Sequence, residues 1–73
     1  MSKTIYSKDH KFLVEQLKKA RQETGLNQEE VAKILGRSQS YISKIESGQR
    51  RVDIIQLKYF SKIYHKPITY FIK

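Results

Sequence analysis

The sequence contains no cysteine, one proline and three glycines among its 73 residues. Without cysteine the chain can form no disulfide and offers no thiolate to a metal, so a domain this short must rely on a packed core, alone or extended by dimerisation. Long apolar runs are also absent, and no stretch approaches the ~18 apolar residues of a membrane-spanning helix. Residues 1–7 lack the apolar core of a signal peptide, so we expect a cytoplasmic protein with no membrane association.

Acidic residues are scarce relative to basic ones. Seven Asp and Glu stand against fifteen Lys and Arg, which leaves a formal net charge of +8. A charge this large on a short chain favours polyanionic partners, because binding releases their condensed counterions. Charge alone does not identify the partner, since a basic amphipathic segment can equally lie on an anionic membrane surface.

Residues suited to catalysis are sparse as well. His10 and His65 lie far apart in the sequence, with no cysteine and no glycine-rich phosphate loop beside them. The carboxylates fall at helix caps or at solvent-facing helix positions, and the chain has little room to enclose a substrate pocket around a core. We therefore expect no enzymatic activity, no cofactor, no metal site and no small-molecule ligand.

The most informative stretch, residues 26–48, predicts two short helices with a turn between them. Asn27 is suited to cap the first helix, and Glu30 at the third helical position completes a capping box. Gly36 ends this helix, and the Ser38 hydroxyl is suited to cap the second.

The second helix of this pair has an apolar edge and a polar face. At about 100° per residue, Ile42 and Ile45 point one way while small or basic hydrogen-bonding side chains point the other. Glutamine can pair with adenine edges and lysine with guanine, whereas serine reads little alone, and the helix N-terminus offers free N–H groups to a phosphate. The outward side chains are Ser40, Ser43, Lys44 and Ser47, and Gln39 lies at the exposed amino end of the helix.

The remaining sequence predicts one domain over residues 1–73, with three further helices around this pair. Residues 1–7 are expected to form a flexible arm, residues 27–47 the helix-turn-helix, and residues 53–72 two C-terminal helices. Asp53 is suited to cap the fourth helix, and Pro67 to begin a short fifth. The predicted helices run from Ser7 or Asp9 to Glu23, over 28–35 and 39–47, from the Asp53 cap to about Tyr64, and from Pro67 to Ile72.

An extended pattern runs through residues 12–72. It comprises Leu17-x-x-Ala20-Arg21, Gly25-Leu26-Asn27-Gln28-Glu29-Glu30-Val31-Ala32, Gly36, Ser38-x-Ser40-x-Ile42-Ser43-x-Ile45-Glu46-x-Gly48 and Leu57-x-x-Phe60. The pattern resembles the Cro/C1-type helix-turn-helix family of phage repressors and their bacterial relatives, and so long a match is far more specific than bare helix-turn-helix spacing. The resemblance implies an all-α, compact, five-helix, lambda-repressor-like domain that binds double-stranded DNA, with the helix-turn-helix at helices 2 and 3.

The resemblance also implies roles for individual residues. Gln39, Ser40 and Lys44 fall at base-reading positions with Ser43 beside them, and Gln28 falls at a phosphate contact. Arg21 and Glu46 fall on a pair that forms an internal ion pair in such domains, although they can also be two unrelated surface charges. The loop arginines can instead enter a narrow minor groove or stay solvated. The predicted phosphate contacts are Asn27, Gln28, Arg37, Tyr41, Ser47, Arg50 and Arg51.

One position departs from the family pattern. His65 stands where the family often has glycine at the end of the fourth helix, so it is expected to adopt a left-handed conformation at some strain. This departure leaves the course of the fifth helix open.

The fourth helix carries more apolar side chains than one small core can bury. Leu57, Phe60 and Tyr64 form one ridge, which falls on the family's core positions, and a second ridge lies on another side. We interpret the second ridge as a homodimer face, since related regulators read palindromic operators with paired helices; loop packing or the arm can cover it instead. The predicted dimer residues are Ile55, Tyr59, Ile63, Ile68 and Tyr70.

The sequence therefore predicts a dimeric, sequence-specific DNA-binding transcriptional regulator. Phage-type repressors, restriction–modification controllers and antitoxins that bind a toxin all use such a domain, and one sequence leaves these open. A helix-turn-helix adaptor that binds proteins is the alternative from another class. In such an adaptor the outward face of the second helix of the pair should carry acidic or apolar side chains. In this sequence the face carries Gln, Ser, Ser and Lys.

Overall fold

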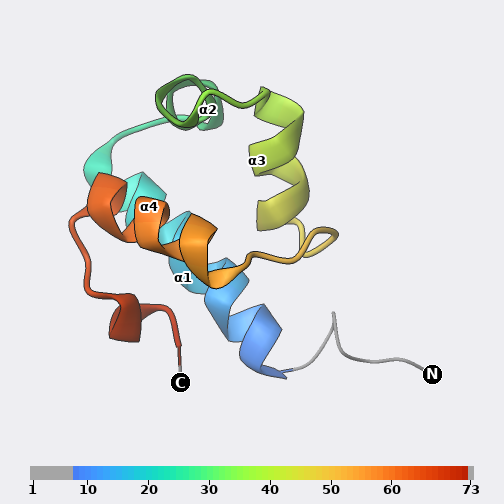
Figure 1. The fold of residues 1–73 in the computed structure, drawn as a ribbon, viewed down its shortest axis with the longest axis vertical. Coiled ribbons are helices and arrows are strands. Elements are labelled where there is room, and N and C mark those ends of the chain that lie inside the picture. Colours follow the sequence, from blue (N-terminus) through green and yellow to red (C-terminus); the bar gives the residue numbers. More distant parts are fainter. Residues whose placement is uncertain (1–7, 73) are drawn as a thin grey trace.

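The computed structural model describes residues 8–72, which fold into four α-helices and a short 3-10 turn with no β-strand in that range (Figure 1). The predicted arm over residues 1–7 lies outside the described residues. The elements are α1 (Lys8–Thr24), α2 (Gln28–Leu35), α3 (Gln39–Glu46), α4 (Ile54–Tyr64) and η2 (Ile68–Tyr70). The all-α prediction is confirmed, and none of the described helices is long and apolar enough to cross a bilayer.

The predicted fifth helix is wrong, because the segment after Pro67 forms only the 3-10 turn η2. Pro67 itself is extended, with φ −70° and ψ 155°, and offers no side-chain cap. Ile68 and Thr69 are β-branched and have a low helix propensity. The few hydrogen bonds of so short a helix do not offset the conformational entropy that is lost in forming its first turn. Phe71, directly after this turn, is fully buried and belongs to the core.

Local side-chain caps define the start of three helices. The Asn27 side chain accepts from the Glu30 amide, and the Glu30 carboxylate accepts from the Asn27 amide, both at 2.8 Å, which confirms the predicted capping box of α2. Ser38 caps α3 and Asp53 caps α4, both as predicted. Each cap satisfies first-turn amides that have no partner within the helix.

The C-terminus of α4 also follows the expectation from sequence. His65 lies in the left-handed region at φ 57°, the single non-glycine residue with positive φ among residues 8–72. Its amide donates to the carbonyls of Lys62 and Ser61. The left-handed turn thus supplies a hydrogen-bond donor to carbonyls in the last turn of the helix.

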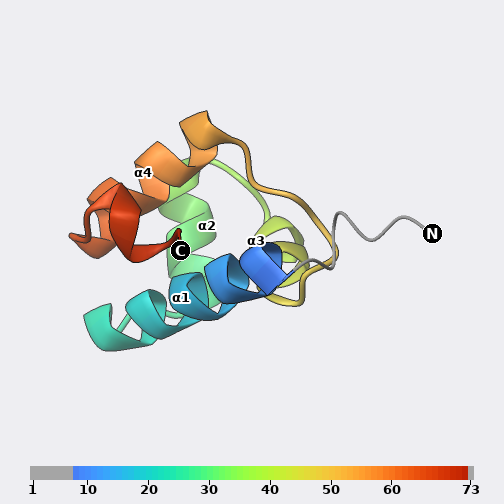
Figure 2. The ribbon, with the colours of Figure 1, turned by 90° about the horizontal axis from the view of Figure 1, so that it is seen from below.

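The core lies where α1, α2, α3 and α4 meet, and the C-terminal segment returns across α1 to complete it (Figure 2). Gln16 of α1 donates to the carbonyl of Tyr70 at 3.1 Å, which fixes this return. The predicted inner ridge of α4 is buried, since Leu57, Phe60 and Tyr64 are all at most 4% exposed. The largest fully buried side chains are Tyr64, Phe60, Phe71, Leu17, Ile42, Ile45 and Val31.

The second ridge of α4 divides into two parts. Ile55 and Tyr59 are 54% and 53% exposed, whereas Ile63 packs partly buried against the core. Ile68 and Tyr70 also pack against the core. Folding back of the C-terminal segment therefore covers the far end of the predicted dimer face and leaves the end next to α3 open.

Candidate nucleic-acid interface

Helix α3 lies along one side of the molecule and is held there by its apolar edge (Figure 1). Ile42 and Ile45 are each 1% exposed and contact the core, as the periodicity predicts. The opposite face carries only exposed side chains, so a partner can reach it. That exposed strip consists of Gln39, Ser40, Ser43 and Lys44. The structure thus brings the four predicted base-reading residues together on one open face, and their contact with bases stays a prediction.

A largely buried ion pair fixes α3 to α1. Arg21 Nε donates to Glu46 Oε2 at 2.7 Å and Arg21 Nη2 donates to Glu46 Oε1 at 3.0 Å, so the predicted pair forms in a two-bond arrangement. The two side chains are only 12% and 5% exposed. Arg21 also donates to the carbonyl of Leu26 at 3.0 Å, just before α2. The hydrogen bond with Glu46 raises the pKa of Arg21, which keeps its charge permanent.

Gln28 continues this network toward the exposed strip. Its Nε2 donates to Glu46 Oε1 at 3.0 Å, and its Oε1 accepts from Gln39 Nε2 at 3.4 Å. The predicted phosphate contact at Gln28 is therefore already oriented by the ion pair, and Gln28 in turn orients Gln39. This link was absent from the sequence prediction, because it joins side chains that come together only when α2 and α3 pack.

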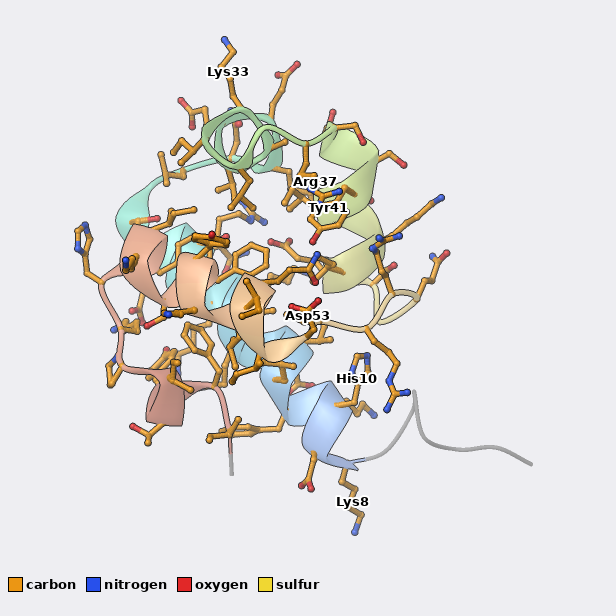
Figure 3. All side chains as sticks on the ribbon, viewed as in Figure 1. Lys8, His10, Lys33, Arg37, Tyr41 and Asp53 are labelled. Carbon is orange, nitrogen blue, oxygen red and sulfur yellow. The ribbon has the colours of Figure 1, made fainter. Side chains whose placement is uncertain are left out.

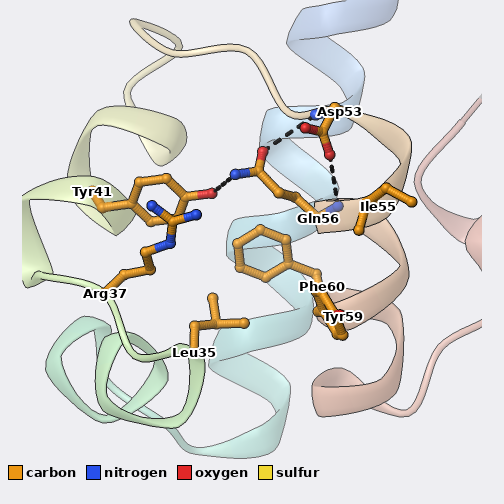
Figure 4. Close-up of a pocket in the computed structure, with 8 residues that line it drawn as sticks. All are labelled: Leu35, Arg37, Tyr41, Asp53, Ile55, Gln56, Tyr59 and Phe60. Carbon is orange, nitrogen blue, oxygen red and sulfur yellow. Dashed lines mark hydrogen bonds between the residues drawn. The ribbon is translucent and has the colours of Figure 1, made fainter.

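The structure gives Tyr41 a different place from the predicted phosphate contact. The side chain is 8% exposed and belongs to the core, and its hydroxyl accepts a hydrogen bond from Gln56 Nε2 (Figures 3 and 4). The Cζ atoms of Arg37 and Arg50 each lie 4.8 Å from the centroid of its ring. Tyr41 thus lies beneath two predicted phosphate contacts, with its own hydroxyl engaged inside the protein.

The other predicted phosphate contacts lie at the surface around α3. Asn27 is exposed, with its side-chain oxygen used as a cap. Ser47 donates to the carbonyl of Lys44 at 3.2 Å and accepts from Gln49 at 3.0 Å. Arg51 is exposed in the loop that follows α3. These positions surround the strip on α3, and their binding to phosphate stays a prediction.

A buried phenol, that of Tyr64, lies near the ion pair. Burial raises the pKa of Tyr64, and the nearby carboxylate of Glu46 adds to the increase. The Tyr64 hydroxyl is buried and has no hydrogen-bond partner in the described part of the chain. The ring stacks on Phe60 with centroids 5.8 Å apart, so the side chain serves packing and remains a neutral phenol.

The described residues contain no group of three or more His, Cys, Asp or Glu that is arranged to hold a metal ion. The hollows near α3 are open and lined mainly by polar and basic side chains. What the arrangement offers chemically is hydrogen-bond donors and positive charge on an exposed helix, which suits a polyanion with readable edges.

Comparison with known proteins agrees with this geometry. A helix-turn-helix family model matches residues 17–71. The crystal structure of FeII HppE in complex with substrate is similar over 89% of this chain, with a TM-score of 0.80 and 18% sequence identity. The similar region is 34% of that longer chain, so this chain spans about a third of its length, and at such low identity the likeness shows a shared fold alone. No curated protein matches the chain.

Proposed function

The chain belongs to the Cro/C1-type helix-turn-helix family, and we propose that it is a sequence-specific regulator that binds double-stranded DNA by placing α3 in the major groove. In this proposal Gln39, Ser40, Ser43 and Lys44 read base edges, and the surrounding polar and basic residues contact phosphates. We propose a binding function without catalysis, cofactor or small-molecule ligand.

The observation that carries the proposal is the exposed strip on α3. It presents amide, hydroxyl and ammonium groups and no carboxylate, in a chain of net charge +8. The one carboxylate of α3, on Glu46, is turned inward and neutralised by Arg21. A surface that bound a basic or apolar protein segment would need acidic or apolar side chains at these positions.

We further propose that the chain acts as a homodimer on a palindromic operator. Ile55 and Tyr59 form an open apolar end of the predicted dimer face, beside the partly buried Ile63, Ile68 and Tyr70. Exposed apolar side chains of this size are common at interfaces, and paired helices about one DNA turn apart bind two half-sites together.

In vitro selection from random DNA duplexes tests the proposal. We expect enrichment of an inverted repeat whose half-sites lie roughly 34 Å apart, about one helical turn. The matched control is a variant with alanine at Gln39, Ser40, Ser43 and Lys44, which should fold normally by circular dichroism and enrich nothing. Enrichment of a single half-site would contradict the homodimer. No enrichment by the wild type at low salt would overturn the proposal of sequence-specific DNA binding.

A further inference from the structure

Two arginines from separate segments converge on one aromatic ring. Arg37 lies in the turn between α2 and α3, and Arg50 lies in the loop between α3 and α4. Both guanidinium carbons lie 4.8 Å from the centroid of the Tyr41 ring, within the range of a cation–π contact (Figure 4 shows Arg37 against the ring). Both arginines are exposed to solvent, so this contact restricts side chains that would otherwise sample many rotamers.

The hydroxyl end of the ring is fixed by the first turn of α4. The Tyr41 hydroxyl accepts from Gln56 Nε2, while Gln56 Oε1 accepts from the Asp53 amide at 3.3 Å. The Asp53 carboxylate accepts from the Gln56 amide at 2.8 Å, which completes a capping box. Tyr41 is thus anchored by a local motif whose geometry does not depend on the arginines.

The two guanidinium groups lack a compensating carboxylate. The ion pairs found within residues 8–72 are Arg21 with Glu46 and Lys66 with Glu23, so neither Arg37 nor Arg50 takes part in one. Two like charges near one ring repel each other, and an anion that contacts both would relieve this repulsion. With no carboxylate paired to them among the described residues, both positive charges are available to an anion.

These arginines border a hollow that opens beside the predicted base-reading strip. The hollow has a volume of about 410 Å³ and begins at the N-terminus of α3, where free amides favour an anion. Lys44 contributes a third positive charge, and the Ser40 hydroxyl lies at the same edge. The lining residues are Gly36, Arg37, Ser38, Ser40, Tyr41, Lys44 and Arg50.

We propose that Tyr41 is a positioning residue that holds Arg37 and Arg50 as a preformed clamp for one backbone phosphate of double-stranded DNA. The proposal rests on the proposed function and deepens it, because it assigns the phosphate next to the bases that Ser40 and Lys44 would read. Tyr41 acts through the arginines and has no contact with DNA itself. Ordering the arginines before binding reduces the entropy lost in the complex.

The salt dependence of binding tests the clamp, with a duplex of scrambled sequence as the probe. Because both arginines would bind the same phosphate, the double variant Arg37→Gln/Arg50→Gln should make the slope of log affinity against log salt less steep by about 0.9, the value for one phosphate contact, and each single variant should produce part of this change. Tyr41→Leu should weaken binding roughly threefold to thirtyfold on scrambled and selected duplexes alike, and Tyr41→Phe, which keeps the ring, should restore most of this loss.

A double-mutant cycle isolates the positioning role, with Arg51→Gln as the matched control. Arg51 is an exposed loop arginine outside the hollow, so its effect should be the same in wild type and in Tyr41→Leu. The effects of Arg37→Gln and Arg50→Gln should shrink in the Tyr41→Leu background. Equal effects in both backgrounds would overturn the positioning role of Tyr41.

A measurement on the unmodified protein keeps the proposal testable if Tyr41→Leu fails to fold. Nitrogen-15 relaxation of the arginine Nε groups, without DNA, should show Arg37 and Arg50 more ordered than Arg51. Arginines of equal mobility would overturn the preformed clamp, as would salt slopes unchanged by Arg37→Gln and Arg50→Gln. Wild-type protein that does not bind the scrambled duplex even at low salt would instead overturn the proposed function.

Discussion

Glu46 joins three helices through one carboxylate. From α3 it accepts two hydrogen bonds from Arg21 of α1 and one from Gln28 of α2. The sequence predicted the pair with Arg21, because Glu46 flanks the inward edge of Ile42 and Ile45 and a charge there needs a partner. It did not predict the bond from Gln28, which depends on how α2 packs against α3.

The first prediction concerns the stability that this carboxylate provides. Glu46→Ala should lower the free energy of unfolding by on the order of 3 kcal/mol or more, because it leaves the Arg21 charge mostly buried and unpaired. Urea melts measure the loss. Glu29→Ala, an exposed carboxylate on α2, is the control and should change stability by less than about 0.5 kcal/mol. A loss below about 1 kcal/mol for Glu46→Ala would show the pair to behave as a surface ion pair.

The second prediction concerns the buried phenol of Tyr64. Burial raises its pKa above the ordinary 10.0, so the folded state holds the proton more tightly than the unfolded chain. The resulting stability is fully present below pH 10 and is lost as pH rises beyond it. Tyr64→Phe should match the wild type or exceed it by up to about 1 kcal/mol at pH 7, since the hydroxyl has no partner within residues 8–72.

Melts between pH 7 and pH 11 compare the two proteins. The wild type should lose stability more steeply above pH 10 than Tyr64→Phe does. Parallel curves, or a clear loss for Tyr64→Phe at pH 7, would indicate that the hydroxyl is bonded or solvated.

The helices illustrate what local sequence determines and where tertiary packing takes over. The caps at Asn27, Ser38 and Asp53 follow from side chains within three residues of the amides they bind, so the sequence predicted them. The 3-10 turn over Ile68–Tyr70 replaced the predicted fifth helix because burial of Phe71 draws the chain inward. Periodicity carries no information on such a contact.

The predictions for residues of α3 differ in the same way between local sequence and tertiary packing. Helical spacing placed Ser40, Ser43, Lys44 and Ser47 on one outward face and left Gln39 at the exposed amino end, and the structure exposes all five. Tyr41 was predicted as a phosphate contact. Its hydroxyl instead meets Gln56, fifteen positions away in the sequence, and this pairing follows only from the docking of α4.

The third prediction concerns the end of α4. His65→Gly should raise stability by about 1 kcal/mol, because glycine adopts the observed φ of 57° without the steric penalty of a side chain. Thermal melts measure the gain, and affinity for DNA should not change. His65→Ala is the control, which keeps the penalty and should give no such gain. A destabilised His65→Gly protein would show that the imidazole supplies a compensating contact.

In the folded molecule as a whole, only part of the predicted dimer face is exposed and available to a second chain. Ile55 and Tyr59 are open, whereas Ile63 already packs against the core. A charge at Ile63 would therefore disturb the fold as well as any interface. Ile55 gives the cleaner test of the proposed homodimer.

The fourth prediction is that Ile55→Glu dissociates the dimer and leaves each chain folded. Two carboxylates would meet across the twofold axis in an apolar contact. Ile34→Glu is the matched control, because Ile34 on α2 is similarly exposed at 58% and lies outside the predicted face. Sedimentation should show dimers for the wild type and Ile34→Glu, and monomers for Ile55→Glu. A wild type that is monomeric at high micromolar concentration without DNA would reject a preformed dimer.

The central claim is that α3 reads the sequence of DNA, and Lys44 is the residue on which it can be tested most directly. Lys44 is exposed at the C-terminal end of the outward strip, and a lysine ammonium can bind guanine O6 and N7. Its removal should therefore affect the preferred sequence far more than other sequences.

The measurement is the ratio of affinities for the selected duplex and a scrambled duplex, at one salt concentration, for wild type and Lys44→Ala. Lys44→Ala should weaken binding to the selected duplex by about 1 to 3 kcal/mol and leave binding to the scrambled duplex closer to that of the wild type, so the ratio falls. An equal loss on both duplexes, with the ratio unchanged, would contradict base reading by α3.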